Sequence, residues 1–241
     1  MRLALALTSA LVAGACSAQI SDGRGSSLAE TDGGTDPTDA APTCASRTVF
    51  LNFEGQALQK GPSDATLNQA SWMQNPTGTA PPYLAGNANR KALIQNIVTG
   101  VTDQLSRFPI TVVTTRPATG NYVMIVFGGQ ASQVGSLYGG AVNQLDCGDA
   151  RPNDVAWIGD GVTPVQRVVN FTVGAIGFGI GLTGTKDQND CMCGWDNQCT
   201  SNNTGPCKLG SPINRDATAN QLCPGSSAQD EPATFHKAFC E

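Results

Sequence analysis

The chain has 241 residues, of which 40% are hydrophobic and only 14% are charged. Its 14 Lys and Arg against 19 Asp and Glu give a formal net charge of -5, which argues against nucleic-acid binding because that requires a basic surface. No apolar run approaches the roughly 20 residues of a membrane-spanning helix. The 28 Gly and nine Cys predict a loop-rich exported domain.

The first 15 residues have the features of a secretory signal peptide. Arg2 supplies the positive start, residues 3–12 (LALALTSALV) the apolar segment, and residues 13–15 the small side chains of a cleavage site. Cys16 follows directly, and VAGAC resembles a bacterial lipobox, whose cysteine is lipidated. We therefore expect a lipoprotein of the bacterial cell envelope, or a secreted protein if Cys16 is not lipidated.

Residues 16–43 have almost no large apolar side chains and are rich in Asp, Gly, Ser and Thr. Such a segment buries too little surface to offset the entropy of ordering it. The sequence predicts a flexible acidic tether here, followed by a folded domain over residues 44–241.

Order is expected to begin with a strand at residues 48–53, followed by a loop rich in Asn, Pro and Gly to about residue 87. Residues 90–108 predict a helix, because their apolar side chains recur at helical spacing. That apolar face consists of Leu93, Ile94, Ile97, Val101 and Leu105.

Three further strands are predicted at residues 110–115, 122–127 and 154–158. The unbroken apolar run YVMIVF at 122–127 is typical of a central strand covered on both faces. Residues 165–182 predict a helix that is buried all round. From about residue 184 the chain is rich in Cys, Asn and Gly. Together these elements predict an α/β (α+β) fold with a mixed sheet, two main helices and a disulfide-rich C-terminal subdomain.

Removing Cys16 from the nine cysteines leaves an even set of eight, which in an oxidising compartment predicts up to four disulfides of unspecified pairing. Cys191 and Cys193 are too close to bridge each other, so each is expected to reach elsewhere. A zinc site built from neighbouring cysteines is disfavoured, because their spacing lacks paired C-x2-C units. The eight are Cys44, Cys147, Cys191, Cys193, Cys199, Cys207, Cys223 and Cys240.

Several stretches resemble the metzincin-like zinc peptidases, in particular secreted bacterial proteins of that type. They are residues 49–55 (VFLNFEG), 110–117, 122–129, 153–156 and 181–192, so the resemblance covers roughly residues 47–195. It implies a twisted mixed sheet, a long buried helix carrying the motif HExxHxxGxxH, and a methionine turn after that helix.

The zinc ligands and the catalytic base implied by this resemblance are absent. Aligning Gly181 with the motif glycine puts the first His on Gly174, the Glu on Ala175 and the second His on Phe178. The third His falls on Gly184, and Met192 takes the place of the methionine in the turn. These residues bind no zinc and move no proton, so neither a zinc cofactor nor peptidase activity is expected.

Other candidate sites are interpreted as ordinary surface residues. Asp146, Asp149 and Asp154 lack the spacing of a calcium loop and are expected to be solvated turn residues, as are Asp187 and Asp190. The single histidine, His236, is expected to lie on the surface near the C-terminus.

The sequence thus predicts a catalytically inactive, metallopeptidase-like protein of the cell envelope that binds an extended peptide or an envelope protein, and no nucleic acid. Contact with the membrane is expected through the lipid anchor alone. Two alternatives remain open: a metal enzyme with relocated ligands, and a structural envelope lipoprotein without a functional cleft.

Overall fold

A computed structural model describes residues 47–195, 199–202, 204–216 and 223–240. The predicted signal peptide, Cys16, the tether over residues 16–43 and Cys44 lie outside the described residues.

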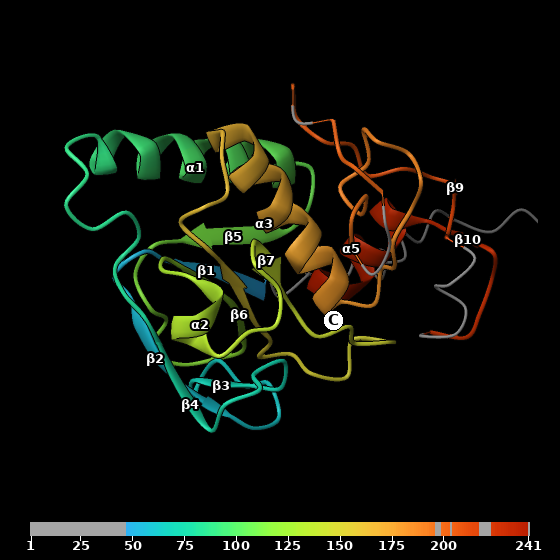
Figure 1. Cartoon of the computed structure of the whole chain (residues 1–241). Coiled ribbons are helices and arrows are strands. Elements are labelled where there is room, and N and C mark those ends of the chain that lie inside the picture. The colour runs from blue at the N-terminus through green and yellow to red at the C-terminus, as the bar shows by residue number, and fades with distance from the viewer. Residues whose placement is uncertain (1–46, 196–198, 203, 217–222, 241) are drawn as a thin grey trace, which may run out of the picture. The chain divides into compact units, whose positions relative to one another are not determined.

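The centre of the fold is a five-stranded mixed sheet (Figure 1). Four strands run parallel, and the fifth, β7, pairs antiparallel with β8 at one edge. The order across the sheet is β5 (Ile110–Val113), β1 (Arg47–Asn52), β6 (Tyr122–Phe127), β8 (Val155–Ile158) and β7 (Ala141–Val142). The mixed α/β architecture and the four predicted strands are confirmed.

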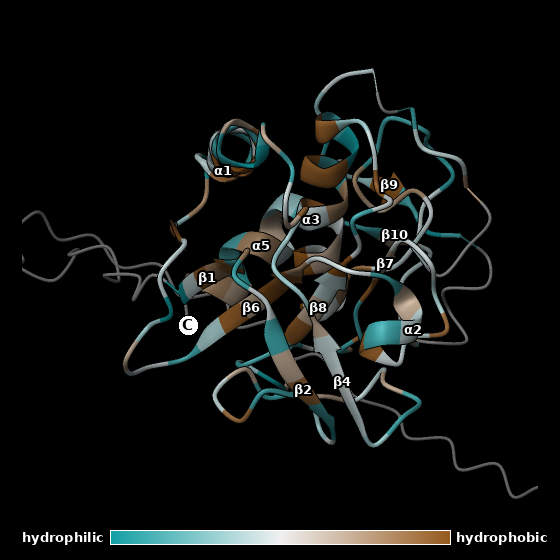
Figure 2. Cartoon of the chain, turned by 60° about the vertical axis from the view of Figure 1, so that its left-hand side comes forward, coloured by the Kyte–Doolittle hydropathy of each residue, from teal (hydrophilic) through white to brown (hydrophobic). Residues whose placement is uncertain are grey.

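Strand β6 lies between β1 and β8, and all six of its residues are buried. Val123, Ile125 and Phe127 belong to one hydrophobic cluster, whereas the alternate residues belong to the other. Because side chains of a strand alternate between faces, β6 contributes to two separate cores. Figure 2 shows apolar colouring concentrated in the central strands and in the helix α3.

Helices cover one face of the sheet. α1 (Arg90–Leu105) and α3 (Val165–Gly179) correspond to the two predicted helices, although each ends three residues earlier than expected. They approach closely at Gly100, where a Cβ atom would lie 2.8 Å from Cγ2 of Val169. On α1, Ile97, Val101 and Leu105 are buried, as the predicted apolar face requires.

The opposite face is covered by a second sheet in the segment that was predicted to be a loop. This sheet has the order β3 (Gln69–Ala70), β2 (Gln56–Lys60) and β4 (Thr77–Ala80), and the short helix α2 (Ala131–Val134) packs on β4. The loop prediction was wrong because these strands are short and mostly polar. In β2, for example, only Leu58 is buried.

A further helix, α5 (Glu231–Cys240), was not predicted. Phe235 and Phe239 are one helical turn apart and fully buried. At the start of the helix, Oδ1 of Asp230 accepts the Ala233 amide at 2.9 Å, which is a side-chain cap. Asp230 followed by this phenylalanine pair is the sequence signal that predicts such a helix.

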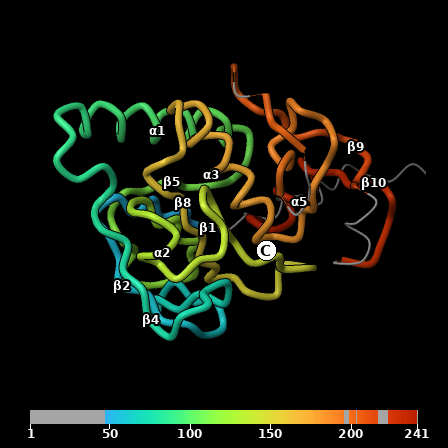
Figure 3. The backbone as a smooth tube through the Cα atoms, in the orientation of Figure 1, coloured from blue at the N-terminus to red at the C-terminus, as the bar shows by residue number. Residues whose placement is uncertain are grey.

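The regular structure among the described residues of the C-terminal part consists of α5 and the pair β9 (Ile213–Asn214) and β10 (Ala228–Gln229). Three disulfides join pairs of described residues, and two of them lie within this region: Cys147–Cys223, Cys191–Cys207 and Cys193–Cys199. Cys240 is disulfide-bonded as well. The tube in Figure 3 follows this region, in orange and red, around α5.

These disulfides are typical of an oxidising, extracellular environment. They also confirm that Cys191 and Cys193 bond elsewhere rather than to each other. Among the described residues, no helix is long and apolar enough to cross a membrane.

Candidate functional site

Helix α3 carries glycines where other segments press against its backbone. A Cβ atom on Gly174 would overlap Nε1 of Trp195 and lie 2.5 Å from the carbonyl oxygen of Cys191. A Cβ atom on Gly177 would lie 2.8 Å from Sδ of Met192. Contacts below about 3 Å are not tolerated, so the glycines let the turn at residues 190–195 pack directly on the helix.

The positions that the resemblance assigns to the zinc ligands and the base are therefore interior packing positions. Ala175 is fully buried, Phe178 is 8% exposed, and Gly184 is buried. Gly181 follows the helix with a φ of 98°, a conformation that favours glycine. The backbone conformation at position 181 therefore accounts for this glycine without reference to the resemblance.

Aromatic rings cover this stretch of α3. The ring of Phe178 lies 5.3 Å from that of Trp195, and Phe171 meets Trp195 edge-on at 6.4 Å. The guanidinium of Arg167 lies 5.0 Å from the centre of the Phe171 ring. These contacts fill the surface of the helix with apolar and stacked groups, which supply neither a metal ligand nor a base.

Met192 is fully buried in a tight turn beneath the helix. Its amide donates to Oδ1 of Asp190 at 2.8 Å, and its carbonyl accepts the Trp195 amide at 3.2 Å. These two hydrogen bonds within the turn define its shape independently of its contacts with α3.

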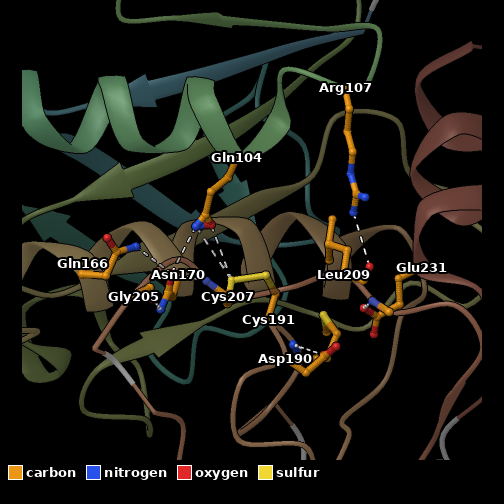
Figure 4. The surroundings of a disulfide bond; sticks show 12 residues. Gln104, Arg107, Gln166, Asn170, Asp190, Cys191, Gly205, Cys207, Leu209 and Glu231 are labelled. Carbon is orange, nitrogen blue, oxygen red and sulfur yellow. Dashed lines mark hydrogen bonds between the residues drawn. A yellow bond between two sulfur atoms is a disulfide. The ribbon is translucent and has the colours of Figure 1, made fainter.

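The Cys191–Cys207 disulfide joins this turn to the segment at residues 205–209 (Figure 4). Asn170, on α3, holds the same segment: its Oδ1 accepts the Cys207 amide at 3.0 Å and its Nδ2 donates to the Gly205 carbonyl at 3.1 Å. From α1, Nε2 of Gln104 also donates to Oδ1 of Asn170, at 3.1 Å. One buried amide side chain therefore links two helices to the disulfide-bonded segment.

An open groove of about 480 Å³ lies between the end of α1 and this segment. Its exposed charges, Arg107 and Lys208 against Asp103, are of mixed sign, so its lining selects no ligand class by charge. The residues that line it are Asp103, Gln104, Arg107, Val173, Cys191, Pro206, Cys207, Lys208 and Leu209.

Strand β7 forms an edge of the main sheet. The Gly159 amide donates to the Gly140 carbonyl at 2.8 Å, and Ala141 lies opposite Ile158. Because bonded and non-bonded pairs alternate in an antiparallel ladder, the N–H and C=O of Ala141 point away from β8. Just before the strand, Leu137 and Tyr138 are 73% and 62% exposed, so apolar surface accompanies this open backbone edge.

The interpretation of the aspartates as solvated turn residues was wrong for three of the five. Asp146, Asp154 and Asp190 are 5%, 0% and 2% exposed. Asp146 accepts the Arg151 amide at 2.6 Å, and Asp149 pairs with Arg47 at 2.7 Å, so both stabilise loops. Asp187 is exposed, as predicted.

Burial raises the pKa of Asp154 to about 6, although the nearby Asn143 side chain, the Val155 backbone and the charge of Arg151 lower it. Neither oxygen of the carboxylate has a hydrogen-bond partner in the described part of the chain. Its carboxylate lies where a Cβ of Gly179 would be. Asp154 is therefore buried against the last turn of α3 and is not available as a surface calcium ligand. Within the described ranges, no group of three His, Cys, Asp or Glu side chains could hold a metal ion.

The burial of Glu231 was not predicted from the sequence. This side chain is fully buried at the start of α5, where it meets Asp190 (Figure 4). A Glu in the first turn of a helix is normally solvated, so nothing in the local sequence distinguishes it. His236 is exposed on α5, where its ring meets Phe108 edge-on at 5.1 Å, and the surface prediction is confirmed.

Comparison with known proteins identifies no relative: no protein-family model matches the chain, and a search of curated proteins gives no match.

Proposed function

We propose that this chain is an exported, catalytically inactive protein with a metzincin-like scaffold, and that it binds an extended peptide along the open edge of β7. The observation that carries the proposal is the packing at Gly174. Trp195 and the Cys191 carbonyl occupy the space that the first zinc ligand would need.

The order of elements supports the scaffold part of the proposal. The strand, helix, two strands and buried helix on which the resemblance rests follow in the same order in the fold, and a buried methionine turn lies beneath α3. Cys16 would attach the domain to the cell envelope through its lipid and the tether.

The binding part rests on β7. A peptide that adds to a sheet edge gains backbone hydrogen bonds from outward-facing N–H and C=O groups and specificity from side-chain contacts nearby. Ala141 offers the backbone groups, and Leu137 and Tyr138 offer exposed apolar surface beside them.

Selection of a random peptide library on the oxidised chain, followed by titration calorimetry of the recovered peptides, tests the proposal. Ala141→Pro removes the outward N–H and leaves the bonds to β8 in place, so we expect affinity to fall about tenfold, as for one lost backbone hydrogen bond. Tyr138→Ser should weaken binding similarly.

Leu67→Ser is the matched control, because Leu67 is also exposed (60%) but lies in the connection between β2 and β3. It should leave the affinity unchanged. Recovery of no peptide, or equal effects of Leu67→Ser and Tyr138→Ser, would contradict binding at β7.

A further inference from the structure

Two carboxyl groups meet in the interior where the turn at residues 190–195 reaches α5. Asp190 is 2% exposed, Glu231 is fully buried, and their carboxyl groups lie side by side (Figure 4). Oδ2 of Asp190 is buried without a hydrogen-bond donor of its own in the described part of the chain. Among the described residues, no Lys, Arg or His forms an ion pair with either. Two buried carboxylates in contact repel strongly, whereas one shared proton turns the repulsion into a hydrogen bond.

The pair joins separate parts of the chain. Oδ1 of Asp190 accepts the Met192 amide at 2.8 Å, and Oε2 of Glu231 accepts the Gly210 amide at 2.8 Å. Oε1 of Glu231 accepts Nε2 of Gln229 at 2.7 Å, and Gln229 also donates to the Thr183 carbonyl at 2.9 Å. The end of α3, the methionine turn, the segment before β9 and the start of α5 therefore converge on these two side chains.

We propose that Asp190 and Glu231 form a proton-sharing latch. The latch holds the turn carrying Met192 and Trp195 against α3 while the pair keeps its proton, and it releases that turn when the pair loses the proton in alkaline solution. The proposal does not depend on peptide binding at β7.

No neighbouring positive charge on the residues that the structure describes takes over the role of the shared proton in neutralising the Asp190–Glu231 pair. Asp187, on the same turn, is exposed and adds negative charge, and Thr185 contributes a neutral hydroxyl. Arg215, on the β9 side, donates to Thr183, Ser226 and Cys223 instead.

The other nearby charges lie on the surface. Lys208, Asp230, His236 and Lys237 are exposed, and Arg107, on the α1 side, donates to the Leu209 carbonyl. Burial, and then the charge of Asp190, raise the pKa of Glu231 to about 8, and burial also raises the pKa of Asp190.

Nuclear magnetic resonance titration of the disulfide-bonded chain between pH 4 and 10 tests the latch. We expect the Glu231 side-chain carbon to titrate on the alkaline side of neutrality, and the amide signals of Met192 and Gly210 to move at the same midpoint. Above that midpoint, amide exchange of Met192 and Trp195 should accelerate at least tenfold beyond the intrinsic effect of pH.

Glu231→Gln keeps a neutral hydrogen-bond donor beside Asp190 and should abolish the alkaline transition. If that variant does not fold, Asp190→Asn makes the same prediction from the other side of the pair. Asp187→Asn, an exposed neighbour, should leave the transition in place. Ionisation of both carboxyls below pH 6, or an unchanged alkaline transition in Glu231→Gln or Asp190→Asn, would overturn the proposal.

Discussion

At the scale of single residues, Gly174 explains why this helix has no room for a metal ligand. A histidine there would need the volume that Trp195 occupies, and the Cys191 carbonyl closes the space from the backbone side. The glycines of this helix admit a turn that two disulfides and an aromatic cluster stabilise.

Gly174→Ala should destabilise the protein by about 2–4 kcal/mol, because even a methyl group overlaps fixed atoms. Gly161→Ala is the control, since a Cβ at Gly161 meets nothing within 4 Å, and it should change stability by less than about 1 kcal/mol. Chemical denaturation at constant pH measures both. Equal stabilities for the two variants would show that Trp195 does not fill this space.

Asp154 should make stability depend on pH. Its pKa is raised from 3.8 to about 6, so the folded chain keeps a proton that the unfolded chain releases. The associated stability is fully present below pH 3.8 and is lost as pH rises through about 6, which corresponds to about 3 kcal/mol. The Asp154→Asn variant should be as stable as the wild type near pH 4 and more stable than the wild type at pH 7. Parallel pH profiles for the two proteins would refute this.

The burial of Asp154 and Asp190 could not be predicted, because an aspartate in a Gly- and Asn-rich segment has the composition of a solvated turn. Only the tertiary packing of α3 and α5 places these side chains inside. Met192 was singled out by its position after the helix, but its contact with the backbone at Gly177 depends on three-dimensional packing.

At the scale of elements, the sequence predicted the helices and strands that have long or strongly periodic apolar patterns. β1, β6, α1 and α3 lie close to their expected positions. β2, β3 and β4 were missed because they are short and half-exposed. β7 was missed because a strand of two residues is too short to show an alternation of apolar and polar side chains. α5 was missed although Asp230 and the Phe235–Phe239 spacing indicate it.

The disulfides should differ in their contribution to stability according to the length of chain that each one closes. Sequence separations of 76, 16 and 6 residues correspond to about 4.5, 3 and 2 kcal/mol for Cys147–Cys223, Cys191–Cys207 and Cys193–Cys199. Replacing each pair by serines and measuring the free energy of unfolding tests the order. The predicted order would be contradicted if removing the Cys147–Cys223 pair lowered the free energy of unfolding least.

At the scale of the whole molecule, the disulfides agree with export, and the proposed anchor predicts where the protein is found. Cys16→Ser should abolish labelling by a radioactive fatty acid and move the protein from the membrane fraction to the soluble fraction. Ser17→Ala, at the neighbouring position, should change neither. Undiminished labelling of Cys16→Ser would exclude Cys16 as the lipidated residue.

The central claim is that a metzincin-like scaffold has filled its metal site with side chains. Elemental mass spectrometry of the purified, oxidised chain after incubation with excess zinc and gel filtration tests this most directly, together with a count of free thiols. We predict no stoichiometric zinc and no free thiols in the mature chain apart from Cys16 if it is not lipidated. About one zinc ion retained per chain would contradict the account and restore the metal-enzyme alternative.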